Sequence, residues 1–476
     1  MAKARSTKKQ MNNVGRIPQP KRPVFKDFVI APTVRKLMQD VRDKVIEPPI
    51  PVIISLSESK TEPKKGIGPS KDVVRKFLDE HGRKYRESEY YIFAKLLPEE
   101  IEGLEKLSEF VYQIWTDEKC DAHLLRSVDT VKASASWRTF AAFGKGVTWA
   151  VMDTGIQSDH PHFKQYDNID HTLSQNFTND GPDPDDKYED DNGHGTHVAG
   201  IIAGEYKPEK EGAFPSSSSE VENSSNPQIE VLDGYPAGIA PRAKLVAIKV
   251  LDANASGPVS NIIRGLEYLR KLNEVGHARK IDGVNISLGY DFDPKWYGCG
   301  YSPLCQEVTR AVRSGLVIVI SAGNSGYGVT TLNNGAQVPI WNDLSIADPA
   351  NTEEAIAVGS SHKSSPHTYG VSYFSSKGPT GDGRMKPDLV APGEKIISCA
   401  LYKPGQAAAY KEDSGTSMAA PHVSGAIAAF LSVRTEFRGE ARIVKEIFLK
   451  SAMDLGREKA FQGAGLVDLM KALMSV

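Results

Sequence analysis

The stretch Val147-Thr-Trp-Ala-Val-Met-Asp-Thr-Gly155 begins as an apolar run of strand length and ends in the polar pair Asp153-Thr154. Further strand-like runs follow it along the chain, at residues 244–250, 284–288, 316–322 and 355–358. Helical patterns alternate with them, at residues 260–272, 306–313 and 418–431. This alternation predicts a doubly wound α/β fold with a mostly parallel sheet covered on both faces. Two polar or turn-rich segments, residues 205–236 and 326–344, are predicted to be surface excursions.

Polar residues that could carry chemistry follow these strands or open helices. Asp153 and Asn324 come just after predicted strands, and such sheets carry their reactive groups at the carboxyl ends of strands. His194 lies in Asn-Gly-His194-Gly-Thr-His-Val-Ala-Gly, and Ser417 lies in Gly-Thr-Ser417-Met-Ala-Ala-Pro-His. The helix predicted after Ser417 would offer free amides and a favourable dipole to an anionic intermediate.

These residues form a set that suits a serine peptidase. A serine hydroxyl is a weak nucleophile, so it needs a base to accept its proton and a carboxylate to orient that base. Ser417, His194 and Asp153 can fill these roles, in one of the few chain orders in which this chemistry recurs. Taken singly, Asp153 has an ordinary interpretation as a turn residue and Ser417 as a helix cap. Their joint occurrence predicts nucleophilic catalysis.

From about residue 133 to the C-terminus, the chain resembles the subtilisin family (subtilases) of serine peptidases in these motifs. The resemblance implies an endopeptidase in which Ser417 attacks, His194 acts as base and then as acid, and Asp153 orients His194. It also implies that Asn324, in Ser-Ala-Gly-Asn324-Ser-Gly, donates to the oxyanion. No cofactor is implied. A catalytically silent scaffold and an esterase or ligase-like transferase are the alternatives.

The resemblance also indicates where a peptide would bind. Subtilases bind the substrate as an added strand between two enzyme segments, which match here Ala255-Ser256-Gly257 and Ser287-Leu288-Gly289. The base of the pocket for the residue before the scissile bond matches Ala347-Asp348-Pro349. If Asp348 pointed inward it would favour basic residues, but we expect it to face solvent.

No metal site is predicted. His194 and His197 have no evident third ligand for zinc. The acidic run at residues 183–191 could attract calcium, although a solvated loop is the favoured interpretation. Many subtilases hold a structural calcium with an Asp nine residues after the catalytic Asp, and this chain has His162 there. We therefore expect no calcium at that position.

The part of the chain before the peptidase motifs differs in composition and in its pattern of predicted helices and strands. Residues 1–49 are predicted to be a basic, Pro-rich extension and linker, and residues 50–122 a small α+β domain. In order and size this domain resembles the ferredoxin-like propeptide of subtilases, which implies an inhibitory partner and a self-processing zymogen. Cleavage would fall within residues 116–127, leaving residues 123–476 as the peptidase domain. A permanent regulatory domain is the alternative.

Composition excludes several classes of protein. The 476 residues are 40% hydrophobic and 25% charged, with a formal net charge of -2, which gives no sign of nucleic-acid binding. No apolar run approaches the roughly 18 residues that span a bilayer, and the basic first residues lack the apolar core of a secretory signal. Four cysteines are too few for a disulfide scaffold, and reduced thiols are favoured over a bridge between Cys299 and Cys305. We expect a cytoplasmic protein with peptide or protein substrates and no nucleic-acid or membrane partner; unconventional export stays open.

Overall fold

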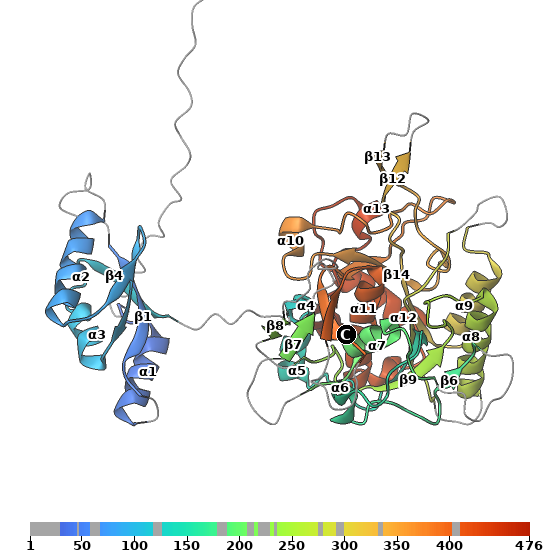
Figure 1. Cartoon of the computed structure of the whole chain (residues 1–476), viewed down its shortest axis with the longest axis horizontal. Coiled ribbons are helices and arrows are strands. Elements are labelled where there is room, and N and C mark those ends of the chain that lie inside the picture. Colours follow the sequence, from blue (N-terminus) through green and yellow to red (C-terminus); the bar gives the residue numbers. More distant parts are fainter. Residues whose placement is uncertain are drawn as a thin grey trace, which may run out of the picture. The chain divides into compact units, whose positions relative to one another are not determined.

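The structure of the chain is a computed structural model that consists of two units (Figure 1). It describes residues 29–44, 47–57, 67–117, 126–178, 188–206, 214–217, 229–232, 236–274, 279–291, 299–331, 337–401 and 410–476. The chain divides into two compact units, residues 1–121 and 122–476.

The N-terminal unit is a four-stranded sheet in the order β2-β3-β1-β4, whose pairs are antiparallel. Its elements are α1 (Pro32–Arg42), β1 (Ile50–Leu56), α2 (Gly68–Glu80), β2 (Tyr85–Glu87), β3 (Tyr91–Leu96), α3 (Pro98–Glu105) and β4 (Val111–Thr116). Every second residue of β1 is buried, and these residues share one core with the buried faces of the helices. The small α+β domain is therefore confirmed. The sequence did not predict β2, because it is short and its side chains lie largely in solvent.

The first helix belongs to this unit, contrary to the predicted extension over residues 1–49. Val34 and Met38 of α1 are buried in the same core as β1. Before the helix, the backbone N–H of Ala31 donates to Ile114 O at 3.0 Å, and Ile114 N donates to Val29 O at 2.7 Å. The boundary predicted at residue 50 thus separates α1 from the sheet on which it packs. Residues 1–28 lie outside the described residues.

The C-terminal unit is built on a seven-stranded sheet in the order β15-β14-β11-β10-β5-β9-β6, in which every pair is parallel. These strands are β5 (Thr148–Asp153), β6 (Gln175–Asn176), β9 (Lys244–Lys249), β10 (Gly283–Ile286), β11 (Val317–Ser321), β14 (Ile356–Ser361) and β15 (Leu389–Pro392). Consecutive residues of β10, β11 and β14 are all buried, so both faces of the sheet are covered. The doubly wound fold is confirmed.

Helices of this unit pack on the sheet and on one another. They are α4 (Arg126–Thr130), α5 (Ala133–Phe140), α6 (Pro161–Lys164), α7 (His194–Ile202), α8 (Val259–Glu274), α9 (Pro303–Arg313), α10 (Pro366–Tyr369), α11 (Thr416–Val433), α12 (Ala441–Ser451), α13 (Lys459–Gln462) and α14 (Leu469–Met474). Among the described helices, α11 is long and apolar enough to cross a membrane by composition, whereas the sequence predicted a helix at residues 418–431 and no apolar run of spanning length. It is instead a core helix, because 83% of it is buried in the unit.

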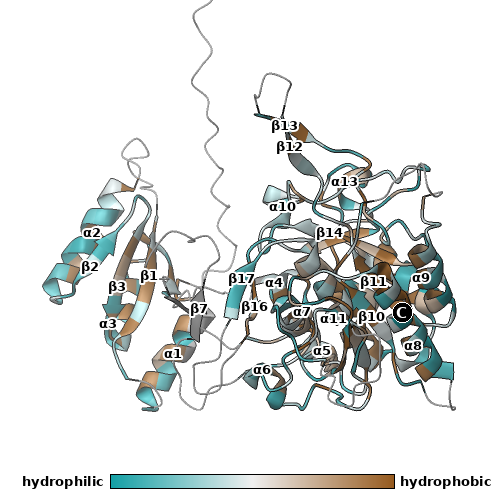
Figure 2. Cartoon of the chain, turned by 45° about the vertical axis from the view of Figure 1, so that its right-hand side comes forward, coloured by the Kyte–Doolittle hydropathy of each residue, from teal (hydrophilic) through white to brown (hydrophobic). Residues whose placement is uncertain are grey.

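The two predicted surface excursions contain strands. Within residues 326–344, where the sequence predicted a turn-rich segment, β12 (Tyr327–Thr331) and β13 (Gln337–Trp341) pair antiparallel, and residues 332–336 lie outside the described residues. Figure 2 shows apolar residues on this hairpin, where Trp341 is 64% exposed. Parts of the other excursion lie outside the described residues, but β7 (Phe214–Ser217) and β8 (Ile229–Leu232) join β16 (Ile396–Cys399) and β17 (Tyr410–Asp413) in a second sheet.

The strand order changes direction beside β5. From β5 the chain adds β6 and β9 on one side and β10 onward on the other. At such a switch point, the loops after neighbouring strands separate and leave room for a ligand at the carboxyl ends of the strands. Asp153 ends β5 at this point.

Candidate active site

Asp153 and His194 form a buried hydrogen-bonded pair. Asp153 is fully buried, and its Oδ1 accepts from His194 Nδ1 at 2.7 Å and from the backbone N–H of Thr154 at 2.8 Å. His194 is the first residue of α7, and its side chain is 24% exposed. The carboxylate therefore holds one ring nitrogen of the imidazole and leaves Nε2 able to exchange a proton with a substrate or nucleophile.

This pairing changes the acidity of the imidazole. Burial of His194 favours its neutral form, but the charge and the hydrogen bond of Asp153 outweigh burial and raise the pKa of His194 above 6.5. Asp413 on β17 raises this pKa further, while Lys411 lowers it. His194 is therefore suited to accept a proton near neutral pH and to release it again.

Ser417 lies in the first turn of α11, which packs against α7. Its hydroxyl donates to the backbone O of Ser287 at 3.2 Å, and among the described residues no hydrogen bond joins it to His194. Bonds between a nucleophile and its base often form only in the substrate complex. The structure thus brings Asp153 and His194 into contact and puts Ser417 on the adjacent helix.

Asn324 follows β11 and is held by the start of α11. Its Oδ1 accepts from the backbone N–H of Thr416 at 2.9 Å and from Thr416 Oγ1 at 3.0 Å. A Cβ atom added to Gly415 would lie 3.4 Å from Asn324 Nδ2 and 3.7 Å from Ser417 N. Two hydrogen-bond donors therefore border one small space beside Ser417. Because Thr416 binds the side-chain oxygen of Asn324, the NH2 group of Asn324 remains available to an anionic ligand.

Removing this donor gives a testable prediction. In Asn324→Ala, kcat should fall about 10²- to 10³-fold, because one donor to the developing oxyanion is lost. Asn324 is exposed, so thermal unfolding should change little. Steady-state kinetics on a peptide substrate, with active enzyme counted by titration, measures the effect. A loss below threefold in kcat would show that Asn324 does not stabilise the transition state.

Of the two predicted peptide-binding segments, one adjoins the nucleophile. Ser287 accepts from Ser417 Oγ, as described, and its own hydroxyl donates to Ser417 O at 3.0 Å. Leu288 is half-buried and Gly289 is exposed. The other segment, Ala255-Ser256-Gly257, is exposed and lies in a turn closed by the 2.8 Å bond from Asp252 N to Ser256 O. No hydrogen bond among the described residues joins this segment to the first.

Asp348 does not face solvent, contrary to expectation. It is fully buried, its Oδ1 accepts from Asn351 Nδ2 at 2.9 Å, and its backbone pairs with Tyr290 through two bonds of 2.9 and 3.0 Å. Nearby, Cys305 is a free buried thiol whose pKa is raised to about 12 by burial and by the charge of Asp348. Cys299 is also free and buried, so the two thiols are unbridged as predicted.

His162 occupies the position where many subtilases have a calcium ligand. It is buried, its Nε2 lies 3.1 Å from Ala203 O, and its Nδ1 lies 3.2 Å from Tyr410 Oη. Burial, together with the charge of His160, lowers the pKa of His162 to about 3, so the imidazole is neutral. A neutral imidazole in these bonds does not fit a calcium site, which needs oxygen ligands. Within the described ranges, no group of three or more His, Cys, Asp or Glu is arranged to hold a metal.

One residue near the site was misjudged from sequence. Asp190 belongs to the acidic run that was interpreted as a solvated loop, and residues 179–187 of that region lie outside the described residues. Asp190 itself is only 8% exposed and is hydrogen-bonded through both carboxylate oxygens. The sequence offered one signal for a role near the site, which is the position of Asp190 four residues before His194. The acidic residues around it favoured the interpretation as a solvated loop.

Known proteins resemble the chain over the unit that holds this site. Residues 144–466 match the model of the Subtilase family (Peptidase S8). The chain is 32% identical to the Major intracellular serine protease of Bacillus subtilis (strain 168) over 350 residues, which cover 73% of this chain and 88% of that protein. It is 33% identical to Serine protease AprX of the same strain over 344 residues (68% and 65%), and 32% identical to Subtilisin E over 329 residues (69% and 66%). The chain therefore belongs to the subtilase family and is a subtilisin-like serine protease, a hydrolase of peptide bonds.

Proposed function

We propose that the chain is a serine endopeptidase that cleaves peptide bonds through an acyl-enzyme formed on Ser417. The observation that carries the proposal is the 2.7 Å bond between buried Asp153 and His194, with Ser417 on the helix packed against that of His194. His194 takes the proton of Ser417 as the hydroxyl attacks the carbonyl carbon, and then gives it to the leaving amine. Asn324 Nδ2 and the backbone N–H of Ser417 bind the oxyanion. Water deacylates the enzyme by the same steps.

The substrate chain binds as an added strand in this proposal. The main chain on the acyl side would lie between Ser287-Leu288-Gly289 and Ala255-Ser256-Gly257, with hydrogen bonds largely indifferent to side chains. Small residues in both segments leave room for a peptide backbone, and Gly289 and the second segment are exposed. The substrates are therefore peptides and proteins, and no cofactor or metal takes part in the steps.

A fluorophosphonate tests the nucleophile directly. Wild-type protein should be phosphonylated at Ser417, because the reagent needs a serine activated by its base. Ser414→Ala removes the exposed neighbouring hydroxyl and should leave labelling unchanged. Peptide mapping of the adduct identifies the labelled residue. Labelling elsewhere, or none in enzyme freed of its N-terminal unit, would refute the assignment.

We also propose that the N-terminal unit acts as a propeptide, an inhibitory partner of the protease that is removed by self-cleavage. The outer face of its sheet carries apolar side chains: Ile53 is flanked by Phe93 and Trp115 across the two ladders. Trp115 is 45% exposed and Tyr91 is 42% exposed. An exposed apolar patch of this kind suits a protein partner. The proposed cleavage falls within residues 116–127, of which 118–125 lie outside the described residues.

The proposed compartment is the cytoplasm. Two of the relatives, from Bacillus subtilis (strain 168) and Paenibacillus polymyxa, are named intracellular serine proteases. The described cysteines, Cys299, Cys305 and Cys399, are free thiols, which is compatible with a reducing environment.

A further inference from the structure

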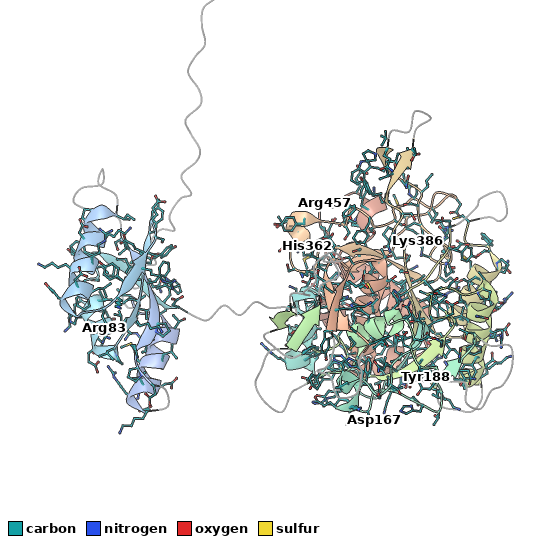
Figure 3. All side chains as sticks on the ribbon, in the orientation of Figure 1. Arg83, Asp167, Tyr188, His362, Lys386 and Arg457 are labelled. Atoms are coloured by element: carbon teal, nitrogen blue, oxygen red, sulfur yellow. The ribbon has the colours of Figure 1, made fainter. Side chains whose placement is uncertain are left out.

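The chain that follows Asp153 crosses the segment that leads to His194. At the crossing, the two backbones are in contact. Gly155 has a φ of 112°, and a Cβ atom there would lie 2.4 Å from the backbone O of Tyr188, which is labelled in Figure 3. A Cβ atom on Gly195 would lie 2.1 Å from Gly155 O and 3.1 Å from Asp153 Cβ. Only glycine fits at these two positions. The distance between Asp153 and His194 therefore depends on how the two segments are held together at this crossing.

Asp190 lies at the crossing and binds both segments. Its two carboxylate oxygens accept five hydrogen bonds of 2.6 to 3.0 Å. Oδ1 accepts from Thr154 Oγ1 and from the backbone N–H groups of Asn192 and Gly193, and Oδ2 accepts from the backbone N–H and the hydroxyl of Thr196. The link to Thr154 reaches the residue after Asp153, and the other links surround His194 on both sides.

Thr154 completes the connection. While its hydroxyl donates to Asp190, the same oxygen accepts from the backbone N–H of Gly195 at 2.9 Å. Thr154 is fully buried, so no water competes for these bonds. A continuous chain of hydrogen bonds thus runs from the residue after Asp153 to the residues on either side of His194.

We propose that Asp190 is the positioning residue that holds His194 against Asp153. The inference rests on the proposed function, in which His194 is the base. The chemistry requires an ionised carboxylate, because all five partners are donors and only a group with acceptors on both atoms can serve them. An amide in its place would turn an NH2 group toward either the Thr154 side or the Thr196 side and would leave a backbone N–H unpaired. The pair of segments would then shift apart.

The test compares Asp190→Asn with Asp191→Asn. Both lose one negative charge, but the side chain of Asp191 is 54% exposed and makes none of the five bonds of Asp190. Its partner Lys249 also donates to the backbone O of Thr154 at 2.6 Å, and Asp191→Asn leaves that donor and acceptor in place. In Asp190→Asn we expect kcat to fall about 10²-fold with KM nearly unchanged, since a misplacement near 1 Å costs that much. Asp191→Asn should stay within threefold of wild type. Active-site titration corrects both values for protein that does not fold.

The pH profile separates positioning from stability. The groups that act on His194 are Asp153 on β5, Lys411 and Asp413 on β17, and His197 on its own helix. Loosening the contact with Asp153 should move the acid limb of kcat/KM to lower pH, because that contact raises the pKa of His194. A residue that only stabilised the fold would lower the melting temperature and the titratable fraction, and would leave this limb in place.

A second variant keeps the inference falsifiable if Asp190→Asn folds poorly. Thr154→Val preserves side-chain volume and removes the hydroxyl, so it should lower kcat in the same direction, and the double variant should lose less than the sum of the two. Wild-type kcat and an unmoved acid limb in titrated Asp190→Asn or Thr154→Val would overturn the inference. Failure of the proposed function is a different result, because wild type itself would then resist the fluorophosphonate.

Discussion

Ser417→Ala should lose hydrolysis of casein almost completely, with kcat about 10⁶-fold below wild type. The reason is that the substitution removes the atom that forms the acyl-enzyme, and the base His194 and the donor Asn324 cannot replace it. Residual hydrolysis would come from oxyanion binding and substrate positioning alone. Release of soluble peptides from casein measures the loss. Ser414→Ala, which alters the exposed neighbour of the same helix start, should keep wild-type activity.

The same variant tests the proposed processing. Wild-type protein should lose every residue before a new terminus within residues 116–127, and Ser417→Ala should keep its full mass. Intact-mass measurement with N-terminal sequencing of both proteins gives the answer. Identical processing in the two would show that another protease makes the cut, and no processing in either would favour a permanent regulatory domain. Casein hydrolysis by Ser417→Ala at wild-type rates would contradict the catalytic assignment itself.

Asp153→Asn should lower kcat about 10⁴-fold while leaving the fold intact. The amide has nearly the same shape, but it carries no charge, so it does not stabilise the imidazolium of His194 or enforce the tautomer with hydrogen on Nδ1. Because Asp153 raises the pKa of His194, its loss should also move the acid limb of kcat/KM to lower pH. In wild type the limb should lie above pH 6.5, since activity requires the neutral imidazole and this group's pKa is raised.

Asp413→Asn is the matched control for this experiment. Asp413 also raises the pKa of His194 through its charge, but it makes no hydrogen bond to the ring. The control should therefore shift the acid limb slightly and keep kcat within about tenfold of wild type. A comparable collapse in both variants would assign the effect to charge rather than to orientation. A loss below tenfold in Asp153→Asn would contradict the role proposed for Asp153.

Short-range patterns of apolar and polar residues were enough to predict much of the fold. The apolar run before Asp153 and the strand ahead of Asn324 were recognisable because strands buried on both faces are continuously apolar. Strand β2 and the hairpin of β12 and β13 were not, since their side chains lie largely in solvent and lack that signal. Helix α1 was separated from its domain because a basic, Pro-rich composition outweighed the buried Val34 and Met38.

The candidate site divides in the same way. Asp153, His194, Asn324 and Ser417 could be selected because each stands in a short motif with its own chemistry. The sequence did not indicate which carboxylates are buried. Asp348 was expected in solvent and is enclosed, and Asp190 was assigned to a solvated run although it accepts five hydrogen bonds. A buried and an exposed carboxylate look the same in the sequence, and only the residues that surround each of them in space distinguish the two.

The sequence by itself determined which groups are available: an acid, a base, a hydroxyl and an amide, spaced along an alternating α/β chain. The order of residues along the chain is enough for this, because the chemistry of a side chain and the periodicity of apolar residues are both properties of the local sequence. Tertiary structure decided which of these groups meet. The 2.7 Å contact of Asp153 with His194 joins residues from a strand and a helix across a crossing where only glycine fits. Such contacts depend on the relative placement of distant segments, which the parallel sheet imposes through its strand order.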